Sequence, residues 1–540
     1  MVIVALEKAT KLDAAEVRGL AQRAGISLRE RDIDDWGVIL GSFSDTAQHI
    51  LNEDDGLPIP DPNKYIRTDI HVPEDTNGGG WATRCTVKSA APTSNLLAGV
   101  TVAVKDNAAV AGVRCLNGAA PVNGEWIPPY DATMVTRVLD AGGIIAGKAA
   151  CENICMECLS DSSYTGKVLN PYSDGHGCGG SSSGSARLVA VGAVDMALGG
   201  DQGGSIRIPS AFCGIVGLKP TWGLVPCTGV LGHVSTFDHV GPMTKTVRDN
   251  ALLLEAIAGP DGRDDRQPLF MDPESLHFSR ALQQFLASKP RDQLLQGFKV
   301  GVLKEGLSGK NMNSSIAQAT RSAVADLQAL GAEVVEVSVP SHEQTVVTWM
   351  SALSLRACRE GLLGDTTGRK QLEMTDRDAT SAPAMGPNPR VSQEVFDSYG
   401  PGAQSLYMRY LYVNEKYGAS LHAKCTNLLF KATQAYDAAL ATVDVLVMPT
   451  VPVPAFAFPP AAGLLDTITY PIGVGDNTPQ FNATGHPALS IPVGFVPAPN
   501  DPDVKLPAGL QIVGKRFEDL TCYKVGAAWE ANKDWKTLVF

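Results

Sequence analysis

The sequence predicts an α/β fold: a large, mixed and mostly buried β-sheet with helices on both faces, preceded by a helical N-terminal segment. Short runs rich in β-branched residues alternate with helix-length stretches along most of the chain, which is the pattern of a sheet covered by helices. The chain has 540 residues, whereas a single hydrophobic core stops growing at about 250–300. We therefore expect either two lobes or one very large layered structure.

Residues 1–80 are expected to be the helical segment. Leu12–Ala24 and Ile33–Leu51 carry apolar residues at helical spacing, and Ser27 is a candidate cap for the second helix. The prolines of residues 57–62 interrupt this pattern, and three consecutive glycines at 78–80 close the section. We predict a domain boundary at 80/81 and interpret the segment as a candidate dimerisation element.

Residues 81–540 are predicted to form the second domain. Val100–Val104 has the composition of a buried strand, Thr133–Asp140 that of a helix, and residues 142–147 that of a turn, a short strand and another turn. Residues 340–440 are helical and irregular, and form either an insertion that covers a site or a plain surface excursion. The other predicted elements are strands at Lys299–Val302, Glu333–Val339, Val443–Met448, Ala488–Val493 and Leu510–Val513, and a helix at Ser315–Leu330.

Composition narrows the functional classes. Apolar residues make up 44% of the chain, which excludes a disordered protein, and 57 acidic against 45 basic side chains give a net charge of −12. A general nucleic-acid binder needs the opposite sign. The longest apolar stretch, Leu188–Leu198, contains Asp195 and is far shorter than the roughly 20 residues that span a membrane. Glu7 and Lys8 interrupt any secretory leader, and eleven scattered cysteines favour a reducing, cytoplasmic setting.

Two short motifs point to cofactors that their contexts do not support. Residues 142–148 match most of a phosphate-binding P-loop, but Ala149 stands where a hydroxyl should bind Mg²⁺. A cysteine-rich stretch lacks the second pair of ligands that structural zinc sites use, so its thiols are expected to be small buried side chains. We predict no cofactor and no metal. The stretch comprises Cys151, Cys155 and Cys158, with His176 and Cys178 further on.

Residues 180–184 match the G-x-S-x-G nucleophile elbow, with Ser182 as the nucleophile and His486 available downstream. An elbow should follow a buried strand directly, but residues 172–179 have the composition of a loop. An α/β-hydrolase-type esterase therefore stays an alternative.

Twelve glycines fall between Gly175 and Gly217, interleaved with several serines. A flexible linker is excluded because Arg187–Leu198 and Phe212–Leu218 have core-like composition. Glycine inside a core marks backbone that turns sharply or approaches something closely, and successive free N–H groups can cradle an anion. The tract predicts a buried site with two serine-bearing loops.

Three blocks in this region resemble the amidase signature family. They are Gly99–Asn107 (GVTVAVKDN), Gly179–Ala186 (GGSSSGSA) and Gly199–Pro209 (GGDQGGSIRIP), and they occur in the right order. Asp444–Thr450 and Asn482–Ala488 look like later landmarks of the family. The resemblance extends from about residue 80 to the end and is greatest to stand-alone bacterial amidases that act downstream of nitrile hydratase.

The resemblance implies a Ser-cisSer-Lys triad, with Ser205 as nucleophile, Ser181 as the bridging serine after a cis peptide bond, and Lys105 as base. The implied reaction is hydrolysis of a carboxamide to an acid and ammonia or an amine through an acyl-enzyme. A lysine acts as a base only where burial favours its neutral amine, and Lys105 follows an apolar strand. Ser183 replaces a glycine that the family commonly has, so this loop is expected to differ locally.

Residues around the nucleophile are assigned supporting roles. Asp201 and Arg207 are expected to pair and fix the nucleophile loop, and Ser182 to support the network around Ser181. His486 is expected to be structural. The predicted oxyanion hole consists of the backbone N–H groups of Gln202, Gly203, Gly204 and Ser205.

Two further readings keep the same triad: a carbamate hydrolase, and the amidase subunit of a tRNA-dependent amidotransferase, which needs partner chains. The expected partner is a small amide or carbamate, with no nucleic acid and no membrane, and the expected assembly is a homodimer.

Overall fold

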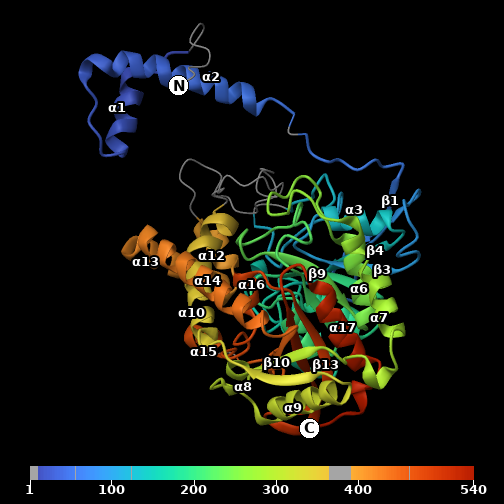
Figure 1. The fold of residues 1–540 in the computed structure, drawn as a ribbon. Coiled ribbons are helices and arrows are strands. Elements are labelled where there is room, and N and C mark those ends of the chain that lie inside the picture. Colours follow the sequence, from blue (N-terminus) through green and yellow to red (C-terminus); the bar gives the residue numbers. More distant parts are fainter. Residues whose placement is uncertain (1–9, 55, 123–124, 364–390, 461–462) are drawn as a thin grey trace. The chain divides into compact units, whose positions relative to one another are not determined.

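The computed structural model describes residues 10–54, 56–122, 125–363, 391–460 and 463–540 (Figure 1). The chain divides into two compact units, Met1–Pro58 and Ile59–Phe540. The first unit contains helices α1 (Ala14–Arg23) and α2 (Ile33–Leu51). Asp13 caps α1 by accepting a hydrogen bond of 2.7 Å from the backbone N–H of Glu16. The prediction that Ser27 caps the second helix is wrong, because a 3-10 turn intervenes and α2 begins only at Ile33.

The second unit is built on a mixed sheet of twelve strands. Their order across the sheet is β1-β2-β4-β3-β7-β9-β8-β13-β14-β12-β10-β11. Four neighbouring pairs are parallel (β3–β4, β3–β7, β10–β11 and β10–β12) and the others are antiparallel. The bounds are β1 Tyr65–His71, β2 Trp81–Ser89, β3 Thr101–Lys105, β4 Ile144–Ala149, β7 Met196–Asp201, β8 Val216–Lys219, β9 His239–Thr244, β10 Lys299–Leu303, β11 Glu333–Val337, β12 Val445–Pro449, β13 Ala488–Ala498 and β14 Asp501–Gly514.

Strand β1 lies within the stretch that was expected to be helical up to residue 80. Tyr65 to Thr68 pair with Ser89 to Thr86 of β2, so this stretch forms the edge of the main sheet. The helices of the N-terminal segment therefore end at Leu51. A separate two-stranded sheet joins β5 (Leu169–Asn170) to β6 (Ser173–Gly177).

Helices cover both faces of the main sheet, as predicted. On β3, Val102 and Val104 join the larger core while Ala103 joins the core on the opposite face, as the alternation of a strand requires. The first face packs against α3 (Thr133–Asp140), α6 (Val247–Ile257), α7 (Phe278–Ala287), α9 (Ser314–Ala329) and α17 (Asp519–Glu530). The second packs against α4 (Ser183–Ala190), α5 (Arg207–Cys213), α14 (Gly418–Leu440) and α16 (Pro479–Thr484).

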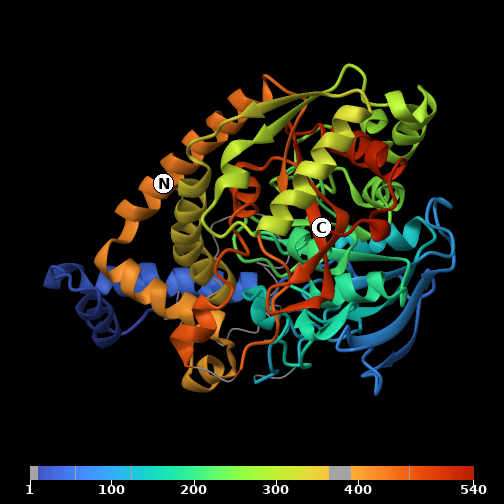
Figure 2. The same cartoon turned by 90° about the horizontal axis from the view of Figure 1, so that it is seen from below.

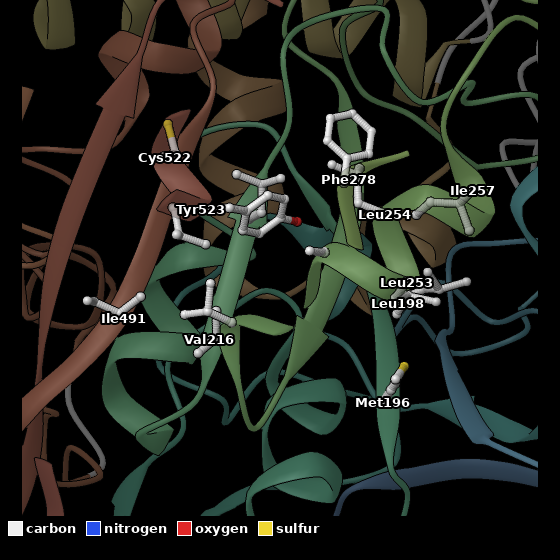
Figure 3. Close-up of a cluster of buried hydrophobic side chains, with 14 of the residues drawn as sticks. Met196, Leu198, Val216, Leu253, Leu254, Ile257, Phe278, Ile491, Cys522 and Tyr523 are labelled. Carbon is white, nitrogen blue, oxygen red and sulfur yellow. The ribbon is translucent and has the colours of Figure 1, made fainter. Parts of the chain in front are cut away.

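Figure 3 shows the centre of the larger core, where Leu198 of β7 and Val216 of β8 lie among helical side chains. Burying one such side chain stabilises the fold by about 1.5–3 kcal/mol. This core fixes β3 and β7 next to each other, and the ends of these two strands carry the candidate site. The helical side chains in the close-up come from α6 (Leu253, Leu254 and Ile257), α7 (Phe278) and α17 (Cys522 and Tyr523).

Residues 340–440 were predicted to be helical and irregular. The described part of this stretch is mainly helical, and residues 364–390 lie outside the described part. In Figure 1 and Figure 2 its yellow-to-orange helices lie together along one side of the sheet. Their buried contacts include Trp349, Leu362 and Leu406. The helices here are α10 (His342–Ala357), the π-helical turn Cys358–Leu362, α12 (Gln393–Ser398), α13 (Pro401–Lys416) and α14; α8 (Lys304–Ser308) and α15 (Leu464–Thr469) lie elsewhere in the chain. No described helix combines the length and apolar content needed to cross a membrane.

Candidate active site

Strands β3 and β7 bring the first two parts of the site together. They pair in parallel with Val104 opposite Leu198. Lys105 and the backbone of Gly200 therefore both lie at the carboxyl ends of these neighbouring strands. The Lys105 side chain is fully buried, and its Nζ donates to Ser181 Oγ at 2.8 Å and to the carbonyl of Gly200 at 3.3 Å. The lysine is therefore placed to exchange a proton with the Ser181 hydroxyl.

The loop that carries Ser181 is held tightly by its neighbours. The peptide bond between Gly180 and Ser181 is cis, as the resemblance implied. A Cβ at Gly180 would lie 2.8 Å from Cγ of Glu152, so only glycine fits there. The backbone N–H of Glu152 donates to the Ser181 carbonyl at 3.3 Å. Glu152 therefore lines the loop and supports it.

The hydroxyl of Ser182 is occupied by backbone groups. Its Oγ donates to the Gly200 carbonyl at 3.1 Å and accepts from the Gly200 N–H at 3.3 Å. A nucleophile elbow should follow a strand of the main sheet, but the strand before Ser182, β6, belongs to the small separate sheet. His486, the candidate histidine of the elbow, bonds instead to Thr484 and Asp437. The described structure thus does not form the elbow alternative. Ser182 Oγ and Lys105 Nζ both donate to the Gly200 carbonyl, and the supporting role of Ser182 at the site stays a prediction.

Ser183, which replaces a family glycine, is accommodated without displacing the cis peptide bond. It is the first residue of α4, is fully buried, and its Oγ has no hydrogen-bond partner among the described residues. The extra hydroxyl is therefore tolerated at the cost of an unpaired buried oxygen.

Ser205 lies between the end of β7 and the start of α5. Its loop is joined to the Ser181 loop by a hydrogen bond of 3.2 Å from the Ser182 N–H to the Ser205 carbonyl. Ser205 is partly exposed and lines a pocket of about 390 Å³, which we call the Ser205 pocket. The structure thus brings Lys105, Ser181 and Ser205 to one place, although 76 residues separate Lys105 from Ser181 along the chain.

Asp201 and Arg207 form a completely buried ion pair, as predicted. Arg207 Nη2 and Nε donate to the two carboxylate oxygens at 2.9 and 3.0 Å. Burial alone would raise the pKa of Asp201, but Arg207 and Asn482 hold it well below its usual range. The same carboxylate accepts the N–H groups of Gly204 at 2.7 Å and Ile206 at 3.1 Å, so it anchors the nucleophile loop at both ends.

Three of the four predicted oxyanion donors are available. The backbone N–H groups of Gln202, Gly203 and Ser205 donate no hydrogen bond to any other described residue. The prediction for Gly204 is wrong, because its N–H already donates to Asp201. An oxyanion in this loop can therefore receive up to three backbone hydrogen bonds.

Sequence reasoning assigned no role to the side chains that hold this loop from outside. Trp349 Nε1 donates to the Gln202 carbonyl at 3.1 Å, and Thr478 Oγ1 donates to the Gly203 carbonyl at 2.7 Å. Asn482 Nδ2 donates to both the carbonyl and the carboxylate of Asp201 at 2.8 Å. Of these three residues, only Asn482 belongs to a motif that the sequence analysis had singled out, the block Asn482–Ala488. Trp349 lies in residues 340–440, which were expected to be an insertion over a site or a surface excursion.

A comparison with known protein families matches the part of the chain that contains the candidate site. Residues 80–523 match the family model described as Amidase. The chain belongs to the amidase family.

The alignments with three similar proteins span most of this chain and most of each relative. It is 40% identical over 432 residues to an enantioselective amidase of Rhodococcus rhodochrous, covering 78% of this chain and 77% of the relative. It is 34% identical to a glutamyl-tRNA(Gln) amidotransferase subunit from Synechococcus sp. (strain CC9902), covering 81% and 83%. The native peptide amidase of Stenotrophomonas maltophilia has a similar structure, with a TM-score of 0.63, 25% identity and coverage of 81% and 82%.

The Ser205 pocket of this amidase is mainly apolar. Ile208, Leu353 and Val474 are among its lining residues, together with the Trp349 ring. Among the polar lining residues is Glu157, whose pKa burial raises to about 7. No group of three or more His, Cys, Asp or Glu in the described ranges is arranged to hold a metal ion.

Proposed function

We propose that this chain hydrolyses carboxamides through an acyl-enzyme on Ser205, with Ser181 as bridging acid–base and Lys105 as base. Hydrolysis of amide C–N bonds is the chemistry of the family to which the chain belongs. The observation that carries the residue assignment is the buried hydrogen bond of 2.8 Å from Lys105 Nζ to Ser181 Oγ. That pair is tied to the partly exposed Ser205 through the Ser182–Ser205 backbone bond.

Acylation begins when Ser205 Oγ attacks the amide carbon. A serine hydroxyl is a weak nucleophile and must transfer its proton as the new bond forms. Ser181 Oγ receives that proton while its own passes to Lys105 Nζ. Negative charge then develops on the carbonyl oxygen, where the free N–H groups of the nucleophile loop are placed to donate. Each such donor is worth about 3–4 kcal/mol in the transition state.

Collapse of the tetrahedral intermediate requires a proton for the leaving nitrogen, since an amide anion is a very poor leaving group. The relay runs in reverse, from Lys105 through Ser181 to the nitrogen, and the C–N bond breaks. A water molecule then attacks the acyl-enzyme with the same relay as base, which releases the acid and restores Ser205.

The test is the loss of acylation in single variants. Ser205→Ala should lower kcat by about 10⁴–10⁶-fold, and Lys105→Ala should have a comparable effect at neutral pH. Labelling with a fluorophosphonate followed by peptide mapping should place the adduct on Ser205. An adduct on Ser182, or full activity in Ser205→Ala, would overturn the assignment.

We also propose that the chain works without partner subunits on small amides. Its 40% identity to the Rhodococcus enzyme, against 34% to the amidotransferase subunit, favours this reading. The purified chain should therefore hydrolyse simple aliphatic or aryl amides by itself. A screen in which only carbamates react would favour a carbamate hydrolase, and activity only with added subunits would favour an amidotransferase component.

We further propose that the chain forms a homodimer through its N-terminal helices. A cytoplasmic location is part of the proposal and is supported by the eleven cysteines, all of which are free thiols. Trp36, Phe43 and Ile50 follow one another at seven-residue spacing on α2 and are 39%, 73% and 63% exposed. An apolar stripe of this kind is typical of a helix that packs on another helix. Sedimentation of the full chain should show a dimer, and Phe43→Ser should weaken it; a wild-type monomer at micromolar concentration would refute this.

A further inference from the structure

The wall of the Ser205 pocket that α13 forms carries a single cationic side chain. Arg409 lies on this helix and is the one arginine or lysine among the described residues that line the pocket. Helix α13 packs beside α10, which supplies Trp349 and Met350 to the same lining. Ser205 and Arg409 therefore share one space of about 390 Å³, which has the size of a site for a small organic molecule.

The guanidinium of Arg409 has only uncharged partners. Its Nε donates to the carbonyl of Ser405, one helical turn earlier, at 3.2 Å, and Nη1 donates to the thioether sulfur of Met350 at 3.3 Å. Within the described part of the chain it forms no ion pair. Two of the five guanidinium N–H groups are thus used, one of them on a weak acceptor, and both N–H groups of Nη2 remain unpaired.

Arg409 is partly withdrawn from water. Its side chain is only partly exposed, and burial lowers the pKa of its guanidinium, with no described carboxylate to offset this. An arginine nevertheless keeps its charge in proteins. A cation that loses water without gaining an anion is destabilised, whereas an anion that joins it forms strong charge-assisted hydrogen bonds. The pocket therefore favours a ligand with a negative group beside Arg409.

Two carboxylates also line the pocket, and each has a partner of its own. Glu157 accepts a hydrogen bond from the N–H of Gly402 in the first turn of α13, and burial raises its pKa to about 7. Gly402 lies about 10 Å before Arg409 along the helix axis. Asp476 accepts from Asn311 Nδ2 at 2.8 Å. Neither carboxylate is therefore the counterion of Arg409.

We propose that Arg409 binds a carboxylate on the acyl part of the substrate, so that the preferred substrates are monoamides of dicarboxylic acids. This inference rests on the proposed hydrolysis at Ser205. The amide carbon lies at Ser205 Oγ, and the distal carboxylate accepts hydrogen bonds from the unpaired N–H groups of Arg409, a pairing that suits the planar shapes of both groups. The apolar side chains of the lining contact the methylene chain that joins the two ends.

Matched pairs of substrates test the charge. Each ω-carboxyl amide from succinamate to suberamate is compared with the neutral amide of the same chain length that ends in an isopropyl group. At the chain length that fits best, kcat/KM of the full-length wild-type chain should be at least tenfold higher for the carboxyl amide. Added salt should raise KM for this substrate and not for its neutral counterpart. Equal kcat/KM for both members of every pair would overturn the proposal.

Variants of α13 test the guanidinium. Arg409→Gln should reduce the preference for the carboxyl amide about 10–100-fold, mainly through KM, because the distal pair forms in the substrate complex and in the transition state alike. Arg409→Lys should restore part of the preference, and Arg409→Glu should reverse it toward amides that end in an ammonium group. The control is Lys416→Gln, which removes a cation from the same helix outside the pocket and should keep the wild-type preference. Equal losses on both members of a pair in Arg409→Gln would indicate a structural role and overturn the proposal.

Binding to the Ser205→Ala chain separates this proposal from the hydrolytic mechanism. Calorimetric titration should show that the best carboxyl amide binds at least tenfold more tightly than its neutral counterpart, and that adding Arg409→Gln removes the difference. This preference without hydrolysis by the wild-type chain would count against the Ser205 mechanism alone. Equal affinities, or no measurable binding of either amide, would overturn the carboxylate site.

Discussion

Asp201→Asn changes the one carboxylate that anchors the nucleophile loop. Oδ1 accepts hydrogen bonds from Gly204 N–H, Arg207 Nη2 and Asn482 Nδ2, and Oδ2 accepts from Ile206 N–H and Arg207 Nε. An asparagine has one oxygen and one NH₂ group. Whichever way it turns, at least two of these donors face another donor.

The expected loss follows from these contacts. At least one neutral and one charge-assisted hydrogen bond disappear, and the Arg207 guanidinium stays buried without its carboxylate. Removing one partner of a buried ion pair costs about 3–5 kcal/mol. Because displacement of the loop also misplaces Ser205 and the oxyanion donors, kcat should fall about 100-fold.

The assay measures unfolding in guanidinium chloride by tryptophan fluorescence, and kcat per folded molecule. Asp264→Asn is the matched control, since Asp264 forms a buried pair with Arg266 and neither residue lines the Ser205 pocket. It should lose stability but keep kcat. Wild-type kcat in folded Asp201→Asn would refute the anchoring argument.

The pH dependence gives a second check with a definite sign. The pKa of Asp201 is lower in the folded than in the unfolded protein. Its contribution to stability is therefore complete above about pH 4, near the unfolded pKa, and is lost as pH falls toward the folded value. The asparagine variant should lack this part of the acid-induced loss.

Three further substitutions have defined outcomes. Trp349→Phe removes the hydrogen bond to the Gln202 carbonyl, so kcat should fall about 5–10-fold with little change in KM; an unchanged kcat would contradict the role of Trp349. Burial raises the pKa of Glu152 to about 8, so wild-type stability should decline from about pH 5 to 8, while Glu152→Gln, measured by denaturant unfolding, should remain flatter across that range. A parallel pH profile in both proteins would show that Glu152 does not titrate there. Ser183→Gly removes an unpaired buried hydroxyl but loosens the backbone, so unfolding free energy should change by less than about 1 kcal/mol; a larger loss would mean that the hydroxyl has a partner.

Regular elements with strong side-chain patterns could be predicted from the sequence. The amphipathic spacing of Ile33–Leu51 and Thr133–Asp140 gave the observed helix bounds. Strands β7 and β9 were missed because their sequences, MALGGD and HVGPMT, contain few β-branched residues. They form strands because the sheet buries them and supplies their hydrogen bonds, and this is a tertiary effect that local propensity does not carry.

The candidate site was predictable where its residues lie in continuous blocks. Lys105, Ser181 and Ser205 came from three such blocks. Which N–H groups of the nucleophile loop remain free depends instead on how far the Asp201 carboxylate reaches, and this is why the prediction for Gly204 failed. Trp349 and Thr478 contact the loop from distant parts of the chain, so no local sequence pattern could predict their roles.

The partners of Arg207 have a consequence for biosynthesis. Its guanidinium bonds to the Thr478 carbonyl, to Asn482 and to Gln511, the last of them 304 residues further along the chain. At translation rates of about 5–20 residues per second, these partners emerge from the ribosome about 15–60 s after Arg207. The nucleophile loop of a growing chain therefore lacks its outer supports until the chain has been translated past Gln511. Amide hydrolysis should begin only after that point.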